Sequence, residues 1–210
     1  MNHDVKAIWP QLYRERRPDW AHVEVPDLRF LAIDGAGDPN TSSAYSEAVA
    51  ALYTLGYAVR AALKARTGDT FVVGPLEGLW TSDDPGSFVR REKDEWRWTM
   101  LIALPPVVEE ADVTAGQAAA LARRPASRIG DVRLEIRAEG RCLQVLHVGP
   151  YDDEGPILAR LHDELMPASG LTWNGPHHEI YLGDPRRVAP ARLRTVLRQP
   201  VRPVGPPATP

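Results

Sequence analysis

A strand-to-helix pattern that occurs twice is the feature that most restricts how this chain can fold. The apolar run Phe30-Leu31-Ala32-Ile33-Asp34 ends in Gly37-Asp38-Pro39-Asn40, and the run Cys142-Leu143-Gln144-Val145-Leu146 ends in Gly149-Pro150-Tyr151-Asp152. Each pattern precedes a segment with helical spacing and then two further runs typical of strands. The sequence therefore predicts an α+β fold made of a duplicated β-α-β-β unit, whose two antiparallel sheets lie edge to edge around a central ligand groove.

The remaining periodicity gives the expected extent of each element. Apolar residues at helical spacing predict helices over 43–66, 109–124 and 152–166. Alternating or continuous apolar runs predict strands over 28–34, 70–80, 96–104, 132–137, 142–148, 177–182 and 193–200. Glu139-Gly140 predicts a tight turn that would pair the strand over 132–137 with the next strand as a hairpin.

Three regions differ in composition. Residues 1–25 are polar with scattered aromatic side chains, and we expect an N-terminal arm that packs loosely. Residues 26–202 carry the periodic pattern and are predicted to form a single domain. Residues 203–210 are rich in proline and are expected to be a disordered tail.

Charge and cysteine content exclude several classes of protein. The net charge is −3, so no basic excess suggests binding to nucleic acid. No run approaches the roughly 20 apolar residues of a membrane span, and the N-terminus lacks the features of a signal peptide. The single cysteine, Cys142, fits a cytoplasmic location and excludes an internal disulfide. His177 and His178 are adjacent and point to opposite faces of a strand, so we expect neither a metal nor another cofactor.

Glu179 and Tyr181 stand two residues apart in a short apolar run, so a strand would direct both side chains to the same face. If Glu179 faces a groove, burial would raise its pKa and its partner would be a cation or a water. The alternative is a structural salt bridge to Arg186 or Arg187.

Tryptophans and a second carboxylate extend this site. Trp96 and Trp98 share a face of one predicted strand, and Trp80 ends another. Stacked indoles form a cage for flat or cationic ligands, although each tryptophan alone is also typical of a packed core. Glu77 lies inside an apolar run, where it is either a groove residue or one partner of a structural ion pair.

Several segments in this order resemble the GyrI-like small-molecule-binding proteins in their stand-alone form. The matching segments run through Phe30-Leu31-Ala32-Ile33-Asp34-Gly35, Gly37-Asp38-Pro39-Asn40, Pro75-Leu76-Glu77-Gly78-Leu79-Trp80, Lys93-Asp94-Glu95-Trp96-Arg97-Trp98-Thr99, Leu146-His147-Val148-Gly149-Pro150-Tyr151-Asp152-Asp153-Glu154 and His177-His178-Glu179-Ile180-Tyr181-Leu182-Gly183-Asp184-Pro185-Arg186-Arg187. The resemblance implies the duplicated fold and a buried glutamate on the strand of Glu179 that meets cationic aromatic drugs.

A stand-alone subfamily is similar to cyclopropanoid cyclopropyl hydrolases, which open the strained ring of DNA-alkylating natural products. The resemblance implies that Glu179 and Tyr181 are catalytic, with Glu179 and Glu77 orienting one water and Tyr181 bonding the ligand carbonyl. The resemblance implies an aromatic cage, which Trp80, Trp98, Tyr151 and Tyr181 could build, and we expect Glu77, Trp96 and Tyr53 as further ligand contacts.

The expected partner is a planar aromatic or cationic small molecule, and the sequence leaves a homo-oligomer open. Only about 25 residues precede the first predicted strand of the domain, too few for a helix-turn-helix unit, so we do not expect a repressor. Three functions remain open from the sequence: a multidrug-binding protein, a hydrolase of cyclopropane-bearing drugs, and a protein-interaction module.

Overall fold

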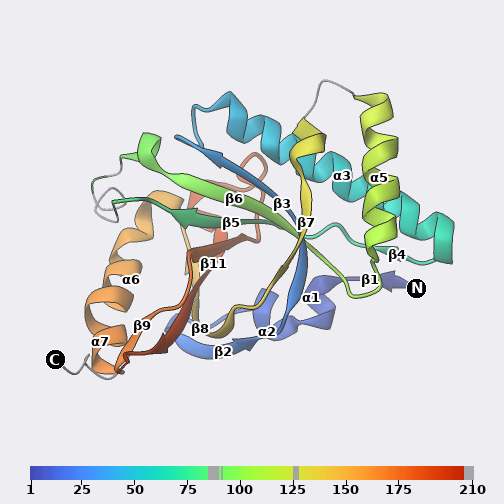
Figure 1. Ribbon diagram of the computed structural model, residues 1–210. Coiled ribbons are helices and arrows are strands. Elements are labelled where there is room, and N and C mark those ends of the chain that lie inside the picture. Colours follow the sequence, from blue (N-terminus) through green and yellow to red (C-terminus); the bar gives the residue numbers. More distant parts are fainter. Residues whose placement is uncertain (85–89, 91, 125–127, 206–210) are drawn as a thin grey trace.

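The computed structural model describes residues 1–84, 90, 92–124 and 128–205. Within these ranges nine strands form one antiparallel sheet in the order β2-β8-β11-β10-β5-β6-β3-β7, and β9 pairs with β11 (Figure 1). A separate parallel pair joins β1 (Asn2–His3) to β4 (Thr70–Phe71). The predicted α+β class is confirmed.

Two β-α-β-β units make up most of the sheet, as the repeat in the sequence predicts. The first contains β3 (Leu28–Ala36), α3 (Ser43–Thr67), β5 (Leu76–Thr81) and β6 (Arg97–Leu104). The second contains β8 (Gly140–Val148), the helical segment that begins with α6 (Gly155–Ala159), β10 (His177–Tyr181) and β11 (Arg194–Pro203). Their strand orders are mirrored, and the antiparallel pairing of β5 with β10 joins the two halves.

The two edge strands of the sheet are exchanged between the halves, because each strand pairs with the half that does not directly follow it in the sequence. The strand β2 (Ala21–Val25), which precedes β3, pairs with β8, whereas β7 (Arg133–Arg137), which precedes β8, pairs with β3. The predicted hairpin between 132–137 and 142–148 is therefore wrong. Glu139 carries the chain across the interior, where it binds His178 and Arg198, and Gly140 turns the backbone with a φ of 61°.

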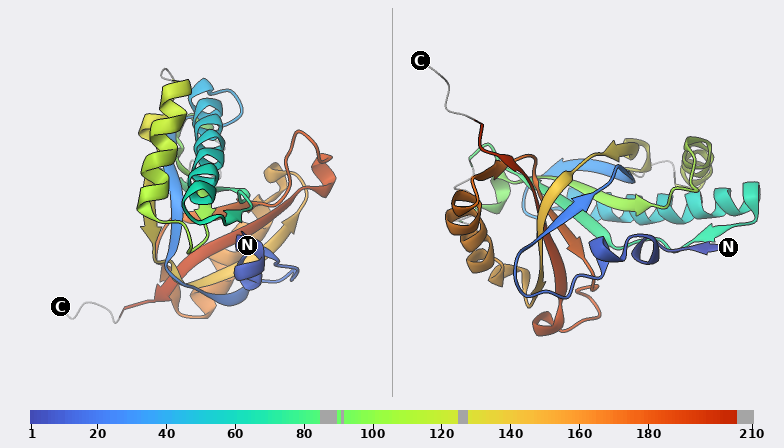
Figure 2. Two further views of the ribbon diagram at one scale, coloured as in Figure 1. Left: turned by 90° about the vertical axis from the view of Figure 1, so that its right-hand side faces the viewer. Right: turned by 90° about the horizontal axis from the view of Figure 1, so that it is seen from below.

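Local signals explain the boundaries of the long helix α3. Ser42 accepts a hydrogen bond from the Tyr45 backbone N–H at its start, and Gly68 adopts a left-handed conformation after its end. The helix α5 (Glu110–Arg123) packs against α3 at Gly116, where an added Cβ would lie 2.8 Å from the Val59 backbone nitrogen. Both helices cover the same face of the first half (Figures 1 and 2).

The helical segment of the second half is irregular. It runs from a short 3-10 turn, η3 (Tyr151–Asp153), through α6 and the π-helical turn η4 (Arg160–Leu165) to α7 (Met166–Ala168). Leu161 and Met166 pack it against β8, β11 and β9 (Leu171–Trp173). The helix predicted over 152–166 is present, and π-helical turns of this kind occur frequently at functional sites.

The N-terminal segment is not the loosely packed arm that its composition suggests. It forms α1 (Val5–Ile8), α2 (Pro10–Tyr13) and the sheet strand β2, and Val5, Leu12 and Tyr13 are buried. The proposed division at residue 26 stays a prediction. At the other end β11 continues to Pro203, and the predicted tail falls largely on residues 206–210, outside those that the structure describes.

The two faces of the central strands have different coverings. Trp80, Trp98 and Met100 lie on the face that α3 covers, whereas Leu79, Leu101 and Ile180 belong to a separate core with residues of α1 and α2. Short 3-10 turns, η1 (Lys93–Glu95), η2 (Arg128–Asp131) and η5 (Pro190–Arg192), complete the described chain. Within the described ranges, no helix combines the length and apolar character needed to cross a membrane.

Candidate functional site

The candidate site lies where the two halves meet, on the helix-covered face of β5 and β10. Alternation along β10 directs Glu179 and Tyr181 to this face and His178 to the opposite one. In the β5–β10 register Gly78 pairs with Glu179, and Trp80 pairs with His177. The helices α3 and α6 belong to different halves, and the central strands lie between them (Figure 2).

A chain of hydrogen bonds ends on the Glu179 carboxylate. Trp80 Nε1 donates to the Tyr181 hydroxyl oxygen at 2.9 Å, and that hydroxyl donates to Glu179 Oε2 at 2.8 Å. The Glu179 side chain is 14% exposed. The salt bridge considered from the sequence does not form, because Arg186 and Arg187 both pair with Asp184. Glu179 is therefore a largely buried acid whose oxygen is held by a tyrosine.

Further aromatic rings adjoin this chain of hydrogen bonds. The Tyr151 ring meets the Tyr181 ring edge to face at 5.4 Å, and the Trp96 ring meets the Trp80 ring at 5.7 Å. Lys93 Nζ lies 5.8 Å from the Trp96 ring centroid. Tyr151 is 37% exposed, so its ring reaches solvent. We call the set Trp80, Trp96, Tyr151, Glu154, Glu179 and Tyr181 the junction site.

Trp98 lies beside the junction site but inside the core. It is 2% exposed, it meets Tyr45 edge to face at 5.2 Å, and its Nε1 donates to the Gly37 carbonyl oxygen at 3.3 Å. This placement corresponds to the core interpretation that the sequence left open. Tyr45 on α3 was not a sequence candidate, yet the charge of Glu179 contributes, after burial, to raising the Tyr45 pKa.

Glu77 and Tyr53 differ in their relation to Glu179. Glu77 is on the opposite face of the sheet, where its Oε1 accepts a hydrogen bond from the Tyr13 hydroxyl at 2.9 Å. Successive residues of a strand alternate in direction, so Gly78 rather than Glu77 faces Glu179. Burial raises the Tyr53 pKa, and the nearby charge that adds most to this shift is that of Asp184. The structure therefore does not bring Glu77 to Glu179, whereas Tyr53 packs on the same core cluster as Tyr45 and Tyr181.

Glu154 is a site residue that the sequence analysis missed. It directly precedes α6, is 5% exposed, and has its pKa raised to about 10 by burial and then by the charge of Glu179. Burial also raises the Glu179 pKa to about 7, although the Tyr181 hydrogen bond and the His178 charge oppose this shift. At neutral pH the two carboxyl groups therefore carry fewer than two negative charges.

Other buried polar atoms lie on the same face. Glu154 Oε1, His162 Nε2 and both ring nitrogens of His177 have no hydrogen bond of ordinary geometry among the described residues. Burial lowers the His177 pKa to about 3, so its ring is neutral at pH 7. His177 Nε2 lies 3.7 Å from Glu179 Oε1, so the imidazole and the carboxylate are neighbours on this face.

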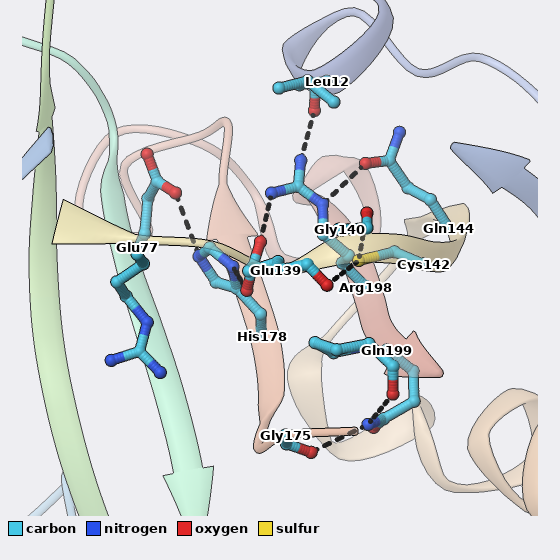
Figure 3. Close-up of polar contacts among 12 residues, drawn as sticks. Leu12, Glu77, Glu139, Gly140, Cys142, Gln144, Gly175, His178, Arg198 and Gln199 are labelled. Carbon is cyan, nitrogen blue, oxygen red and sulfur yellow. Dashed lines mark hydrogen bonds and ion pairs between the residues drawn. The ribbon is translucent and has the colours of Figure 1, made fainter. Parts of the chain in front are cut away.

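The opposite face of β5 and β10 carries a buried network of charged groups (Figure 3). His178 binds Glu77 Oε2 at 3.0 Å through Nε2 and Glu139 Oε1 at 2.8 Å through Nδ1. Arg198 binds Glu139 Oε2 at 3.1 Å and the Leu12 carbonyl oxygen at 3.1 Å. We call Tyr13, Glu77, Glu139, His178 and Arg198 the buried charge network. In the described part of the chain, no group of three or more His, Cys, Asp or Glu side chains is placed to hold a metal ion.

Comparison with solved structures gives both close and distant relatives. An uncharacterized conserved protein from Listeria innocua is 33% identical, with a TM-score of 0.86 over 95% of this chain and 100% of its own. A hydrolase from Listeria innocua is also 33% identical, with a TM-score of 0.80 and the same coverage. The EcmrR C-terminal domain, at 14% identity and a TM-score of 0.57 over 89% of this chain and 98% of its own, shares the fold.

The search of curated proteins finds no match. A family model does match, and it covers both halves of the sheet and the junction site, from residue 21 to residue 202. This chain belongs to the family of the GyrI-like small molecule binding domain.

Proposed function

We propose that the junction site binds a planar aromatic small molecule and that Glu179 activates a water to hydrolyse it. The observation that carries this proposal is the hydrogen bond from the Tyr181 hydroxyl to a buried Glu179 carboxylate whose pKa is about 7. A carboxylate is most effective as a general base when its pKa lies near the working pH. The hydrolase from Listeria innocua, 33% identical over nearly the whole chain, supports a hydrolytic reaction.

The rings of the junction site suit a flat substrate. Tyr151 reaches solvent and packs on Tyr181, and Trp80 is fixed by its hydrogen bond to the same tyrosine. Rings that are held in place stack on a planar ligand with little loss of conformational entropy. Stacking would also exclude bulk water from Glu179, and exclusion of water strengthens each electrostatic interaction there.

Cyclopropane-bearing DNA-alkylating drugs are the substrate class that we propose. Water would form a bond to a cyclopropane carbon while Glu179 takes its proton. The carbon–carbon bond that breaks would deliver its electron pair to the conjugated carbonyl, which becomes a phenolate and then takes a proton. Once Glu179 has taken the proton from water, the Tyr181 O–H is no longer needed by that carboxyl group and can donate a hydrogen bond to the phenolate oxygen, while Glu154, protonated at neutral pH, can supply the proton. Ring strain provides driving force, so positioning and a modest base suffice.

Binding without turnover is the second candidate. An acid that shares its surroundings with Trp80, Trp96 and Tyr151 also fits a cationic aromatic ligand, because both the ring faces and the carboxylate attract positive charge. In this case the protein would sequester drugs rather than destroy them. The partial ionisation of Glu179 at neutral pH makes such binding stronger as the pH rises.

Turnover separates the two candidates. We would incubate the protein with a cyclopropane-bearing alkylator in water enriched in oxygen-18 and follow the ring-opened adduct by mass spectrometry. The proposal predicts a labelled adduct that forms faster than in buffer and slows at least tenfold in Glu179→Gln. The exposed Glu110→Gln on α5 is the matched control and should keep the full rate.

An adduct that forms no faster than in buffer would exclude the hydrolase. Calorimetric titration with a planar cationic dye and with a neutral aromatic of similar size would then test the binding role. Tighter binding of the dye that weakens in Glu179→Gln would support that role, and equal binding in both proteins would remove Glu179 from the site.

A further inference from the structure

The buried charge network lies directly behind the junction site and connects the two halves. Glu77 comes from β5 in the first half, His178 from β10 in the second, and Glu139 from the segment that crosses between them. The His178 and Glu77 side chains are 0% exposed and Glu139 is 5% exposed. The β5–β10 pair therefore has a polar anchor on one face and the proposed reactive acid on the other.

His178 is held as an imidazolium. Its Nδ1 is hydrogen-bonded to Glu139 Oε1 at 2.8 Å, and its Nε2 lies 3.0 Å from Glu77 Oε2, although the angle of this second contact is not that of a hydrogen bond. Burial lowers the His178 pKa, but the two carboxylates outweigh burial and raise it, which favours a ring protonated on both nitrogens. Charge balance leads to the same conclusion. Two carboxyl groups, Glu77 and Glu139, face one guanidinium, that of Arg198, and an imidazolium at His178 makes the numbers of acidic and basic groups equal.

Other groups complete the surroundings of His178. The Tyr13 hydroxyl of α2 donates to Glu77, and the amide oxygen of Gln144 on β8 accepts from Arg198 Nε at 2.9 Å. The thiol of Cys142 on β8 is nearby, and burial raises its pKa to about 12, so it is neutral. The Phe30 ring of β3 meets the imidazole edge to face at 6.4 Å.

Among the residues that the structure describes, the groups that face Glu179 offer it no comparable cation. His177 and Tyr181 share its strand, Tyr45 faces it from α3, and Tyr151 and Glu154 face it from η3 and the start of α6. Of these groups His177 is neutral at pH 7, the tyrosines are protonated, and Glu154 is an acid. His178 is the next residue to Glu179 along β10 and supplies the positive charge on the other side of the strand.

We propose that His178 is a positioning residue for Glu179. Its buried imidazolium, held between Glu77 and Glu139, fixes β10 against β5 and places a positive charge behind the Glu179 carboxylate, which favours the ionised form that abstracts a proton from water. The inference rests on the proposed function of Glu179 as a base. According to this inference, the buried charge network on the opposite face of the sheet affects the reaction as well as the stability of the fold.

The test measures the titration of Glu179 directly. Glutamate labelled with carbon-13 at the side-chain carboxyl carbon reports each midpoint by NMR, and Glu179→Gln identifies the signal. His178→Gln alone would leave the carboxyl groups of Glu77 and Glu139 with one arginine. The main variant is therefore Glu77→Gln/His178→Gln, which removes one carboxyl group together with the imidazole. His22→Gln on β2 is the control for loss of a histidine.

We expect the Glu179 midpoint to rise by about one pH unit in the double variant and to stay unchanged in His22→Gln. With a midpoint moved from about 7 to about 8, kcat/KM at pH 7 would fall about fivefold and recover above pH 9. A purely structural role would lower activity equally at every pH. A double variant that is folded and titrates like the wild-type protein would overturn the inference.

Two results separate this inference from the proposed function. A shifted midpoint in a protein that shows no hydrolysis would support the role of His178 and reject the hydrolase. Nitrogen-15 shifts of the His178 ring in the wild-type protein need no variant, and a neutral ring at pH 7 would overturn the inference even if the double variant did not fold.

Discussion

Gly78 lies directly opposite Glu179 in the pairing of β5 with β10. A Cβ at this position would lie 3.0 Å from Trp80 Nε1 and 3.1 Å from the Tyr181 hydroxyl oxygen. The hydrogen bond between these two side chains therefore passes over a residue without a side chain. Glycine at position 78 permits the close approach that places Tyr181 against Glu179.

Gly78→Ala tests this relationship. The added methyl group would press on Trp80, Tyr181 and Met100, and overpacking of this kind costs about 1–3 kcal/mol. We expect a folded protein that binds a planar ligand about tenfold more weakly, measured by calorimetric titration. Gly130→Ala, where an added Cβ meets no atom within 4 Å, should bind normally. Unchanged affinity in Gly78→Ala would show that the Trp80–Tyr181 contact is irrelevant to the ligand.

Glu179→Gln should change how stability depends on pH. The Glu179 pKa is raised from 4.5 to about 7 in the folded protein, so the folded state holds this proton more tightly than the unfolded chain. The protonated Glu179 therefore adds to the free energy of unfolding below pH 4.5, and this contribution is lost as the pH rises through about 7. Urea unfolding should show the variant more stable than wild type at pH 8, on the order of 3 kcal/mol, and similar at pH 4. A constant difference at both values would contradict the raised pKa.

Glu139→Gln should destabilise the fold at neutral pH. The variant leaves Arg198 and His178 without one of their buried carboxylates, and breaking a buried pair from one side costs about 3–5 kcal/mol. Burial alone would raise the Glu139 pKa. The positive charges of His178 and Arg198 outweigh burial and hold this pKa well below its usual range. The contribution of Glu139 to the free energy of unfolding is therefore present above the pKa that Glu139 has in the unfolded chain, and it is lost as the pH falls through the lower pKa of the folded protein. Acid titration followed by circular dichroism should show wild-type stability approaching that of the variant at low pH.

Gly35→Ala should displace Trp98. The added Cβ would lie 2.0 Å from an atom of the Trp98 ring, which is closer than any real contact. Since Trp98 is buried against Tyr45 and α3, the indole has to move, and we expect a loss of about 1–3 kcal/mol. Thermal unfolding and tryptophan fluorescence would measure the effect, with Gly130→Ala as control. A native melting temperature would show that the core beside Trp98 yields easily.

Tyr151→Ala should weaken ligand binding without harming the fold. Tyr151 is partly exposed and packs on Tyr181, so its ring is available to stack on a planar ligand. We expect a loss of about 1–3 kcal/mol in binding free energy, by analogy with stacking of bases on aromatic side chains. Tyr57→Ala removes a tyrosine that is 57% exposed on α3 and should leave binding unchanged. Equal affinity in both variants would place the ligand elsewhere.

The sequence predicted what depends on local periodicity. The spacing of Glu179 and Tyr181 was enough to place both side chains on one face of a strand, and the repeated strand-to-helix pattern was enough to predict the duplicated unit. The face that Glu77 occupies could not be predicted in this way. Both faces of β5 are buried, so its apolar pattern does not distinguish the ligand-facing side from the other.

Two other features depend on contacts between distant segments. Glu154 follows Asp152 and Asp153, and such an acidic run before a helix is typical of a solvated helix start rather than a buried acid. Its position two residues after the second strand-to-helix pattern was the available signal. Tyr13 lies in a polar segment, and nothing near it in the sequence indicates that its hydroxyl reaches Glu77, 64 positions away.

The exchange of β2 and β7 has a consequence for how the chain could be divided. A fragment that ends before β8 would keep β7 on β3 but leave β2 with nothing to pair with, and the complementary fragment would lack the strand that closes its own border. Neither piece is therefore a self-sufficient module. Both units have to be present together for the two outer strands of the sheet to find their partners.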